Sequence, residues 1–205
     1  SVDWIADAYS ATSPHVVAVI PTFHREREVE DRVSRLSELK QSLPSSNSFD
    51  ILVVDNGGTI RCSAMGEAIV VPSENFGGAG GFARGLIEAR DLGASHCLFM
   101  DDDVDFHTES IRRILVMLEL SVDPDTAVAG AMFSDQDRTK FWEIGAQFDG
   151  FCRPAFHGHS AVDQKQVENL LSSMNQSPQP GFYAGWWMFA FPLRNVAHLP
   201  FPFFL

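Results

Sequence analysis

Short apolar runs alternate with amphipathic segments along the first 133 residues of the chain. The apolar runs are continuous and rich in β-branched residues, which is typical of strands buried on both faces of a sheet. The segments between them repeat apolar residues three and four positions apart, which indicates helices with one buried face. The pattern predicts strands at 15–20, 49–54, 68–71, 96–100 and 127–133, and helices at 26–43, 82–91 and around 111–118.

This order of elements predicts an α/β fold, in which a mostly parallel sheet is flanked by helices. Beyond Ser134 the pattern weakens to a charged turn, one amphipathic segment at 162–174 and an aromatic run at 185–192. We therefore divide the chain into a lead-in at 1–14, an α/β half at 15–133 and a mixed segment at 134–205.

Polar residues follow three of the predicted strands directly. They are the segments 22–25, 55–58 and 101–105. In open α/β sheets ligands bind beyond the carboxyl ends of the strands, so these segments are expected to meet at one edge. A polar loop follows most strands, but that rule does not require an aspartate immediately after two of the apolar runs.

The run Asp101-Asp102-Asp103-Val104-Asp105 carries the candidate chemistry. Side chains alternate along a strand, so Asp101 and Asp103 are expected to converge on one point. Carboxylates this close repel one another unless a cation lies among them, and such oxygens suit Mg²⁺ or Mn²⁺. On these residues alone, a metal site and a solvated acidic turn remain equal interpretations.

The composition of the chain limits the kinds of partner and the cellular compartment that it suits. The net charge of −12 and the pI of about 4.8 argue against a nucleic-acid-binding protein, which needs a basic surface. The three cysteines show neither zinc-ligand spacing nor a disulfide framework, which favours a reducing compartment. No apolar run is long enough to span a bilayer. We expect a cytoplasmic protein, with any association with the inner face of the plasma membrane made through parts outside this chain.

Four motifs in sequence resemble a known family. They are Val-Ile-Pro-Thr-Phe at 19–23, Val-Val-Asp-Asn-Gly at 53–57, Asn-Phe-Gly-Gly-Ala-Gly-Gly at 75–81 and Met-Asp-Asp-Asp at 100–103. Together they resemble the inverting family 2 glycosyltransferases of GT-A fold, in particular galactofuranosyltransferases and rhamnosyltransferases. The resemblance covers residues 15 to about 205. It implies transfer of a sugar from a nucleotide-diphosphate donor, such as a UDP-sugar, to a glycan or lipid-linked acceptor in cell-wall or surface polysaccharide synthesis.

The resemblance also implies roles for individual residues. Thr22 and Arg25 would line the uracil and ribose pocket, and Asp55 would hydrogen-bond the uracil ring. Asp101 and Asp103 would hold Mn²⁺ or Mg²⁺. The catalytic base of the family is an aspartate that follows a segment resembling 200–205, so it is expected after Leu205 and no base is assigned. The remaining positions implied to contact the donor are Asn75, Gly77, Gly78 and Asp102.

Arg84 and the paired tryptophans are candidates on physical grounds. Arg84 lies in the first turn of a helix expected to begin near Phe82, where the positive helix end and a guanidinium could both meet a phosphate. Trp186 and Trp187 could offer a stacking platform for a sugar ring, or could belong to a core strand.

Weaker signals lead to alternatives. The pair His157 and His159 is more typical of an exposed loop than of a metal site, and Glu143 is more typical of a salt-bridge partner than of a catalytic residue. The glycine-rich segment could be misread as a dinucleotide fingerprint, but that motif should follow the first strand. A sugar-nucleotide-binding module without turnover and, more weakly, a nucleotide-dependent oxidoreductase therefore remain as alternatives to the enzyme.

Overall fold

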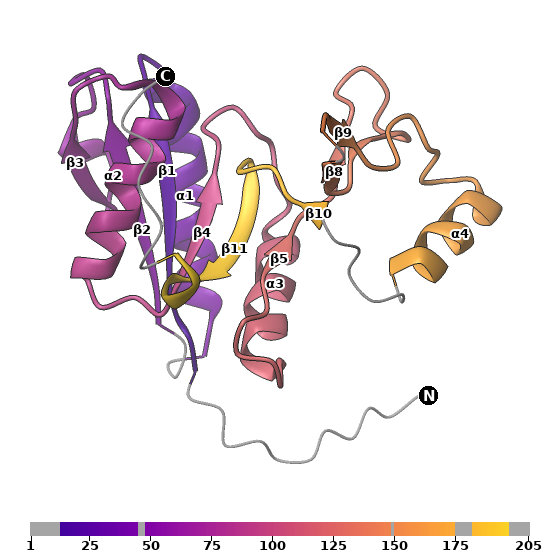
Figure 1. The fold of residues 1–205 in the computed structure, drawn as a ribbon. Helices are drawn as coiled ribbons and strands as arrows, with labels where there is room; N and C mark the ends of the chain where they lie inside the picture. Colours follow the sequence, from indigo (N-terminus) through magenta and orange to yellow (C-terminus); the bar gives the residue numbers. More distant parts are fainter. Residues whose placement is uncertain (1–12, 45–47, 149, 175–181, 197–205) are drawn as a thin grey trace. The chain divides into compact units, whose positions relative to one another are not determined.

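The structure is a computed structural model that describes residues 13–44, 48–148, 150–174 and 182–196 (Figure 1). The first twelve residues of the lead-in and the apolar segment 200–205 lie outside the described residues. The main element is a mixed six-stranded sheet with the strand order β3-β2-β1-β4-β11-β5. The predicted α/β fold class is confirmed.

A parallel core of four strands organises this sheet. Strand β1 (His15–Thr22) lies between β2 (Ser48–Asp55) and β4 (His96–Met100) and is parallel to both. Strand β3 (Ile69–Pro72) extends the parallel pairing on the far side of β2. Every residue of β1 after His15 is buried, which explains its continuous apolar sequence.

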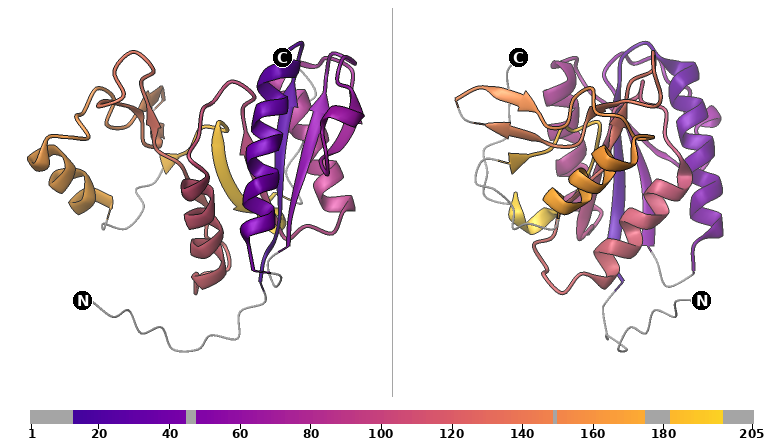
Figure 2. Two further views of the ribbon diagram at one scale, coloured as in Figure 1. Left: turned by 180° about the vertical axis from the view of Figure 1, so that it is seen from behind. Right: turned by 90° about the vertical axis from the view of Figure 1, so that its right-hand side faces the viewer.

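Helices cover both faces of this core. Helix α1 (Glu26–Ser42) and α3 (Thr108–Leu120) contact each other on one face, and α2 (Gly77–Asp91) packs against β1, β2 and β4 on the other (Figures 1 and 2). The stripes predicted from the sequence are the buried ones: Val29, Val33, Leu36 and Leu39 in α1, and Ile111, Ile114, Leu115 and Leu118 in α3.

The single strand predicted at 127–133 is wrong. The structure has two short strands there, β5 (Val128–Ala129) and β6 (Met132–Phe133), and they belong to different sheets. Gly130 lies between them and donates its N–H to the carbonyl of Met188 at 2.9 Å. A Cβ at Gly130 would lie 2.8 Å from the Met188 sulfur, so a larger residue here would require the Met188 side chain to move.

The described chain divides into two compact units. One contains the residues up to Val128 and those from Ala190 onward, and the other is Ala129–Phe189. The second unit holds β7 (Phe141–Glu143), β8 (Ala146–Phe148), β9 (Cys152–Pro154), α4 (Gln164–Met174) and β10 (Phe182–Tyr183). Strands β10, β8 and β9 form a three-stranded antiparallel sheet, and β6 pairs with β7.

The remaining elements are short. Strand β11 (Met188–Pro192) takes up the end of the aromatic run, and two 3₁₀ turns lie at Cys62–Ala64 and Leu193–Asn195. Among the described residues, no helix has the length and apolar character needed to cross a bilayer.

Candidate functional site

The carboxyl ends of β1, β2 and β4 meet at one edge of the sheet, as the sequence predicts. Thr22 at the end of β1 is the register partner of Asp55 at the end of β2. The N–H of Asn56 donates to the carbonyl of Thr22 at 2.9 Å, and this bond continues the ladder by one residue. Arg25, three residues beyond Thr22, reaches the acidic run that follows β4.

The guanidinium of Arg25 bridges two carboxylates of this run. Its Nη1 lies 3.0 Å from Asp102 Oδ1 and 2.6 Å from Asp103 Oδ2. Asp101 lies deeper, and burial, followed by the charges of Asp103 and Asp102, raises its pKa to about 6 despite the opposing effect of Arg25. Three carboxylates thus lie near one guanidinium, which pairs with two of them, and this crowding favours an additional cation.

Asp105 does not belong to this group. Its carboxylate pairs with Arg35 Nη1 at 2.7 Å, and this contact lowers the pKa of Asp105. Arg35 also donates to the carbonyl of Phe106 and lies over its ring at 4.4 Å. The last acidic residue of the run is therefore paired with helix α1. Asp101, Asp102 and Asp103 remain as the carboxylates at the carboxyl edge of the sheet.

The carboxylate of Asp55 organises the loop that follows β2. Its Oδ1 accepts the N–H groups of Gly57 and Gly58 at 3.0 and 2.9 Å, and its Oδ2 accepts the N–H of Ile60 at 2.8 Å. The side chain is only 3% exposed. Asp55 thus has a structural role that the sequence did not indicate, and its predicted contact with a base can use only its remaining acceptor capacity.

Two polar atoms beside Asp55 are buried without a hydrogen-bond partner among the described residues. They are Thr22 Oγ1 and Asn56 Oδ1, in side chains that are 2% and 8% exposed. Buried polar groups are nearly always hydrogen-bonded. Two neighbouring buried oxygens without a partner, at the ends of β1 and β2, therefore indicate a ligand position. Sequence reasoning missed Asn56, since a polar residue after a strand end is common and only its burial distinguishes it.

The glycine-rich segment is helical, which corrects the prediction that its helix begins near Phe82. Helix α2 begins at Gly77, whose φ of 68° and N–H bond to Asn75 Oδ1 at 3.0 Å shape the entry to the first turn. Gly78 faces open space. Because the N–H of Gly77 is bonded to Asn75, an anion at this end of α2 would meet the N–H of Gly78, which has open space beside it.

Arg84 consequently lies in the second turn of α2 and not in the first. Its guanidinium pairs with Glu88 at 2.5 Å, one turn further along the helix. The predicted contact with a phosphate would require this surface pair to open.

The second unit contains the remaining sequence candidates. Trp186 is 41% exposed and Trp187 only 8%, so the ring of Trp186 is the more accessible of the two for stacking. Trp187 Nε1 and Glu143 Oε1 are buried without a partner among the described residues. His157 Nδ1 lies 2.8 Å from the carbonyl of Trp142, and the ring of His159 packs on Phe156.

The donor set at the end of β4 fits part of a magnesium or manganese site. The described residues contain no group of three or more aspartate, glutamate, histidine or cysteine side chains arranged to enclose an ion. Mg²⁺ commonly binds through one or two carboxylates and completes its coordination with water and substrate phosphates. Asp101 and Asp103 supply donors of that kind.

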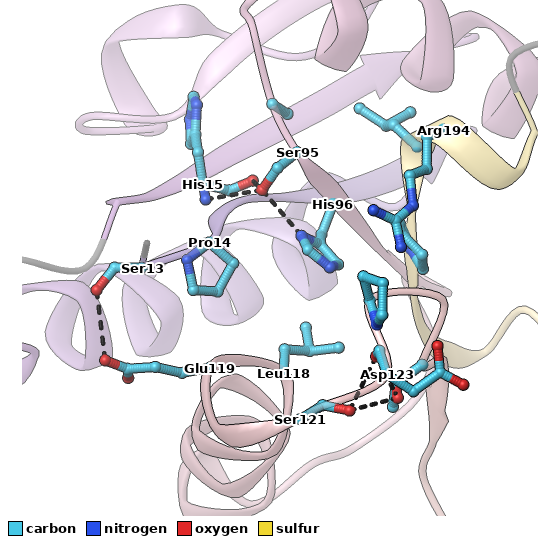
Figure 3. A pocket seen from close by; sticks show the side chains of 15 residues that line it. Ser13, Pro14, His15, Ser95, His96, Leu118, Glu119, Ser121, Asp123 and Arg194 are labelled. Atoms are coloured by element: carbon cyan, nitrogen blue, oxygen red, sulfur yellow. Dashed lines mark hydrogen bonds between the residues drawn. The ribbon is translucent and has the colours of Figure 1, made fainter. Parts of the chain in front are cut away.

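A cavity of about 670 Å³ lies at the opposite edge of the sheet (Figure 3). It is lined by the first residues of β1 and β4, His15 and His96, and by Arg194. Side chains around it are paired with one another, as in the contact between Ser95 Oγ and His96 Nδ1 at 2.8 Å. No predicted site residue lies in this cavity, and the candidate chemistry is at the carboxyl edge.

Comparison with known proteins gives the family. The model of glycosyl transferase family 2 matches residues 17–183, and the chain belongs to this family. Among curated proteins, it is similar to galactofuranosyltransferase GlfT2 of Mycolicibacterium smegmatis, with 24% identity over 230 residues. The match covers 100% of this chain and 34% of that protein, so the chain spans about a third of its relative.

Solved structures agree on the fold. Glucosyl-3-phosphoglycerate synthase from Mycobacterium tuberculosis, in complex with Mn²⁺ and UDP-glucose, matches with a TM-score of 0.54 and 17% identity. That match covers 92% of this chain and 59% of the synthase. Mannosyl-3-phosphoglycerate synthase from Rubrobacter xylanophilus matches with a TM-score of 0.52 and 20% identity, over 88% of this chain and 54% of the synthase.

Proposed function

We propose that this chain is the donor-binding part of a metal-dependent, inverting glycosyltransferase that uses a UDP-sugar. The observation that carries the proposal is the group Asp101, Asp102 and Asp103 at the end of β4 in a family 2 chain. Arg25, which follows β1, pairs with two of these carboxylates. In open α/β sheets this edge is where ligands bind.

Asp101 and Asp103 would hold Mn²⁺ or Mg²⁺, and Asp102 would contact the ion or the ribose. The bound ion would supply positive charge to the leaving diphosphate. The side chains that crowd this edge are the reason an ion is needed, because three carboxylates repel a diphosphate. The N–H of Gly78 and the positive N-terminal end of α2 would add a second positive element, while the N–H of Gly77 stays bonded to Asn75.

The nucleoside would lie over the ends of β1 and β2. Thr22 Oγ1 can donate to a carbonyl oxygen of the uracil ring, and Asn56 Oδ1 can accept its N3–H or a ribose hydroxyl. Asp55 keeps the loop at 56–60 in place and can add one acceptor through Oδ2. Asn75 fixes the entry to α2 and would lie against the donor.

The acceptor would be a glycan or lipid-linked sugar, with Trp186 as the stacking surface and Trp187 behind it. Similarity to a galactofuranosyltransferase supports galactofuranose as the transferred sugar, and rhamnose is the alternative. We propose that the reaction belongs to cell-wall or surface polysaccharide synthesis and takes place in the cytoplasm, at the inner face of the plasma membrane. The proton of the acceptor hydroxyl would pass to a carboxylate after Leu205.

Calorimetric titration with UDP, dTDP, GDP and ADP in the presence of Mn²⁺ tests the donor class. We expect UDP to bind most tightly and dTDP to be second or equal, since the two pyrimidine rings share the edge that Thr22 and Asn56 would read. The larger purines should bind weakly. Equal affinity for all four diphosphates would show that the chain does not recognise a uracil ring, and tightest binding of GDP would contradict the proposal.

Thr22→Val provides a matched variant for this test, because valine keeps the shape of threonine and lacks the hydroxyl. Loss of one hydrogen bond predicts roughly a two- to tenfold weaker affinity for UDP. Affinity for Mn²⁺ in the absence of nucleotide should stay unchanged. An unaltered affinity for UDP would show that the buried hydroxyl does not contact the base.

A further inference from the structure

Arg25 combines a backbone that begins helix α1 with a partly exposed side chain that pairs with the acidic run. Its carbonyl accepts the N–H of Val29 at 3.1 Å, so the residue forms the N-terminal boundary of α1. Its side chain is 44% exposed and reaches the acidic run 77 residues further along the chain. Because little of the guanidinium is buried, it can leave the carboxylates without exposing a core.

The guanidinium of Arg25 contacts a carboxylate that is proposed to hold the ion. Arg25 Nη1 lies 2.6 Å from Oδ2 of Asp103, which would be one of the metal ligands. Among the described residues, the other arginines nearby have different partners: Arg32 pairs with Asp31, and Arg35 pairs with Asp105. Arg25 therefore supplies the positive charge that the acidic run has in the free protein.

A divalent cation on Asp103 would weaken the contact between Arg25 and the same carboxylate. Two positive charges held about 4 Å apart repel each other, and the divalent ion brings twice the charge of Arg25. The displaced guanidinium would then lie at the edge where the diphosphate arrives. Guanidinium groups bind phosphate oxygens with good geometry, so the same side chain gains a new partner.

We propose that Arg25 is a positioning residue that couples the metal to the nucleotide. It competes with the divalent ion for Asp103 in the free protein and binds the diphosphate once the ion has displaced it. The inference rests on the proposed function. It adds that the ion binds weakly alone, that the diphosphate strengthens ion binding, and that Arg25 carries part of this coupling.

The coupling between Mn²⁺ and UDP binding can be measured, because each ligand must affect the other equally. If UDP strengthens Mn²⁺ binding by some factor, Mn²⁺ must strengthen UDP binding by the same factor. Arg25→Gln removes the competing charge and the phosphate partner while keeping a polar side chain. It should bind Mn²⁺ more tightly than wild type in the absence of nucleotide, and the factor by which UDP strengthens Mn²⁺ binding should fall.

The experiment is a titration of Mn²⁺ followed by electron paramagnetic resonance, which reports the free aqueous ion, with and without UDP. The ion pair is partly exposed, so we expect Arg25→Gln to bind Mn²⁺ alone about two- to fivefold more tightly. Arg25→Lys keeps the charge and should stay near the wild-type affinity. Arg113→Gln removes one exposed charge from α3, where Arg113 pairs with Glu109, and is the control for net charge.

The outcomes separate this inference from the proposed function. Tighter Mn²⁺ binding by Arg25→Gln and not by Arg113→Gln, together with a smaller effect of UDP, supports the coupling. If wild type binds UDP in a manganese-dependent way but Arg25→Gln binds Mn²⁺ no more tightly, the coupling is wrong and the proposed function stands. If Mn²⁺ has no effect on the affinity of wild type for UDP, both are overturned.

Discussion

The backbone N–H of Ile60 donates to Asp55 Oδ2 at 2.8 Å, across a loop of four residues. Gly57 and Gly58 occupy the other oxygen of the same carboxylate. A side chain predicted to read a base is therefore also the residue that shapes the loop beside the base. Any test of its binding role has to separate these two functions.

Asp55→Ala should weaken UDP binding and also destabilise the protein. A hydrogen bond to a charged group contributes about 1.5–3 kcal/mol, and the variant leaves three backbone N–H groups without their acceptor. We expect a loss of at least about 1.5 kcal/mol in the free energy of unfolding, measured by urea denaturation. Unchanged stability would contradict the loop-forming role.

Asp55→Asn is the companion variant, because its amide oxygen can still accept the N–H groups of Gly57 and Gly58. It should be more stable than Asp55→Ala and still bind UDP less tightly than wild type in calorimetry. If UDP affinity is the same in wild type and Asp55→Asn, the charge of Asp55 plays no part in binding the nucleotide.

Gly85 allows α2 to approach the sheet. A Cβ at this position would lie 2.1 Å from Val19 Cγ1 and 3.3 Å from Val54 Cγ2. Gly85→Ala should therefore overpack the interface and destabilise the fold by about 1–3 kcal/mol. Gly78 lies in the same helix and faces open space, so Gly78→Ala should raise stability by about 0.5–1 kcal/mol. Thermal unfolding of the two variants should shift in opposite directions, and equal shifts would argue against close packing at Gly85.

Asp50 should make the fold sensitive to acid. Burial raises its pKa, but hydrogen bonds from His15 at 2.8 Å and Lys40 at 3.0 Å outweigh this effect, so the pKa lies below the ordinary value of 3.8. A depressed pKa in the folded state adds stability above about pH 4, and this contribution is lost as the pH falls through the folded-state pKa.

Urea unfolding between pH 7 and pH 3 tests this. Asp50→Asn should be less stable than wild type at pH 7 and should lose less stability below pH 4. Asp91→Asn removes an exposed aspartate at the end of α2, which pairs with its neighbour Arg90, and should keep the wild-type profile. A wild-type pH profile in Asp50→Asn would show that this cluster does not govern acid stability.

The strongly periodic part of the fold was predictable from the sequence, because local pattern and tertiary burial agree there. The apolar run of β1 is buried along its length, and the stripe of α1 at Val29, Val33 and Leu36 faces the sheet. The break at Gly130 was not predictable, since it depends on Met188, 58 residues away in the chain. The helical start at Gly77 was not predictable because glycine has a low helix propensity. Further along α2, Gly81 and Gly85 let the helix pack closely on Pro21 and Val19.

The position of the candidate site in the fold was predictable to about the same extent as the fold itself. The motifs correctly brought the ends of β1, β2 and β4 to one edge, because parallel strands align their carboxyl ends. Arg35 pairs with Asp105 and keeps it apart from the other three aspartates, and Asn56 is buried. Both features depend on contacts between distant segments, for which the sequence pattern carries no signal.

The central claim is that the acidic run makes nucleotide binding depend on a divalent ion. Calorimetry with UDP and with uridine, each in the presence of Mn²⁺ and of a chelator, tests it most directly. A cation reverses the local charge and can bridge to phosphates, which uridine lacks. The chelator should therefore weaken UDP binding strongly and leave uridine binding almost unchanged, and Asp103→Asn should remove this difference without unfolding the protein. Equal affinity for UDP with Mn²⁺ and with the chelator would show that Asp101–Asp103 is a solvated turn and would contradict the account.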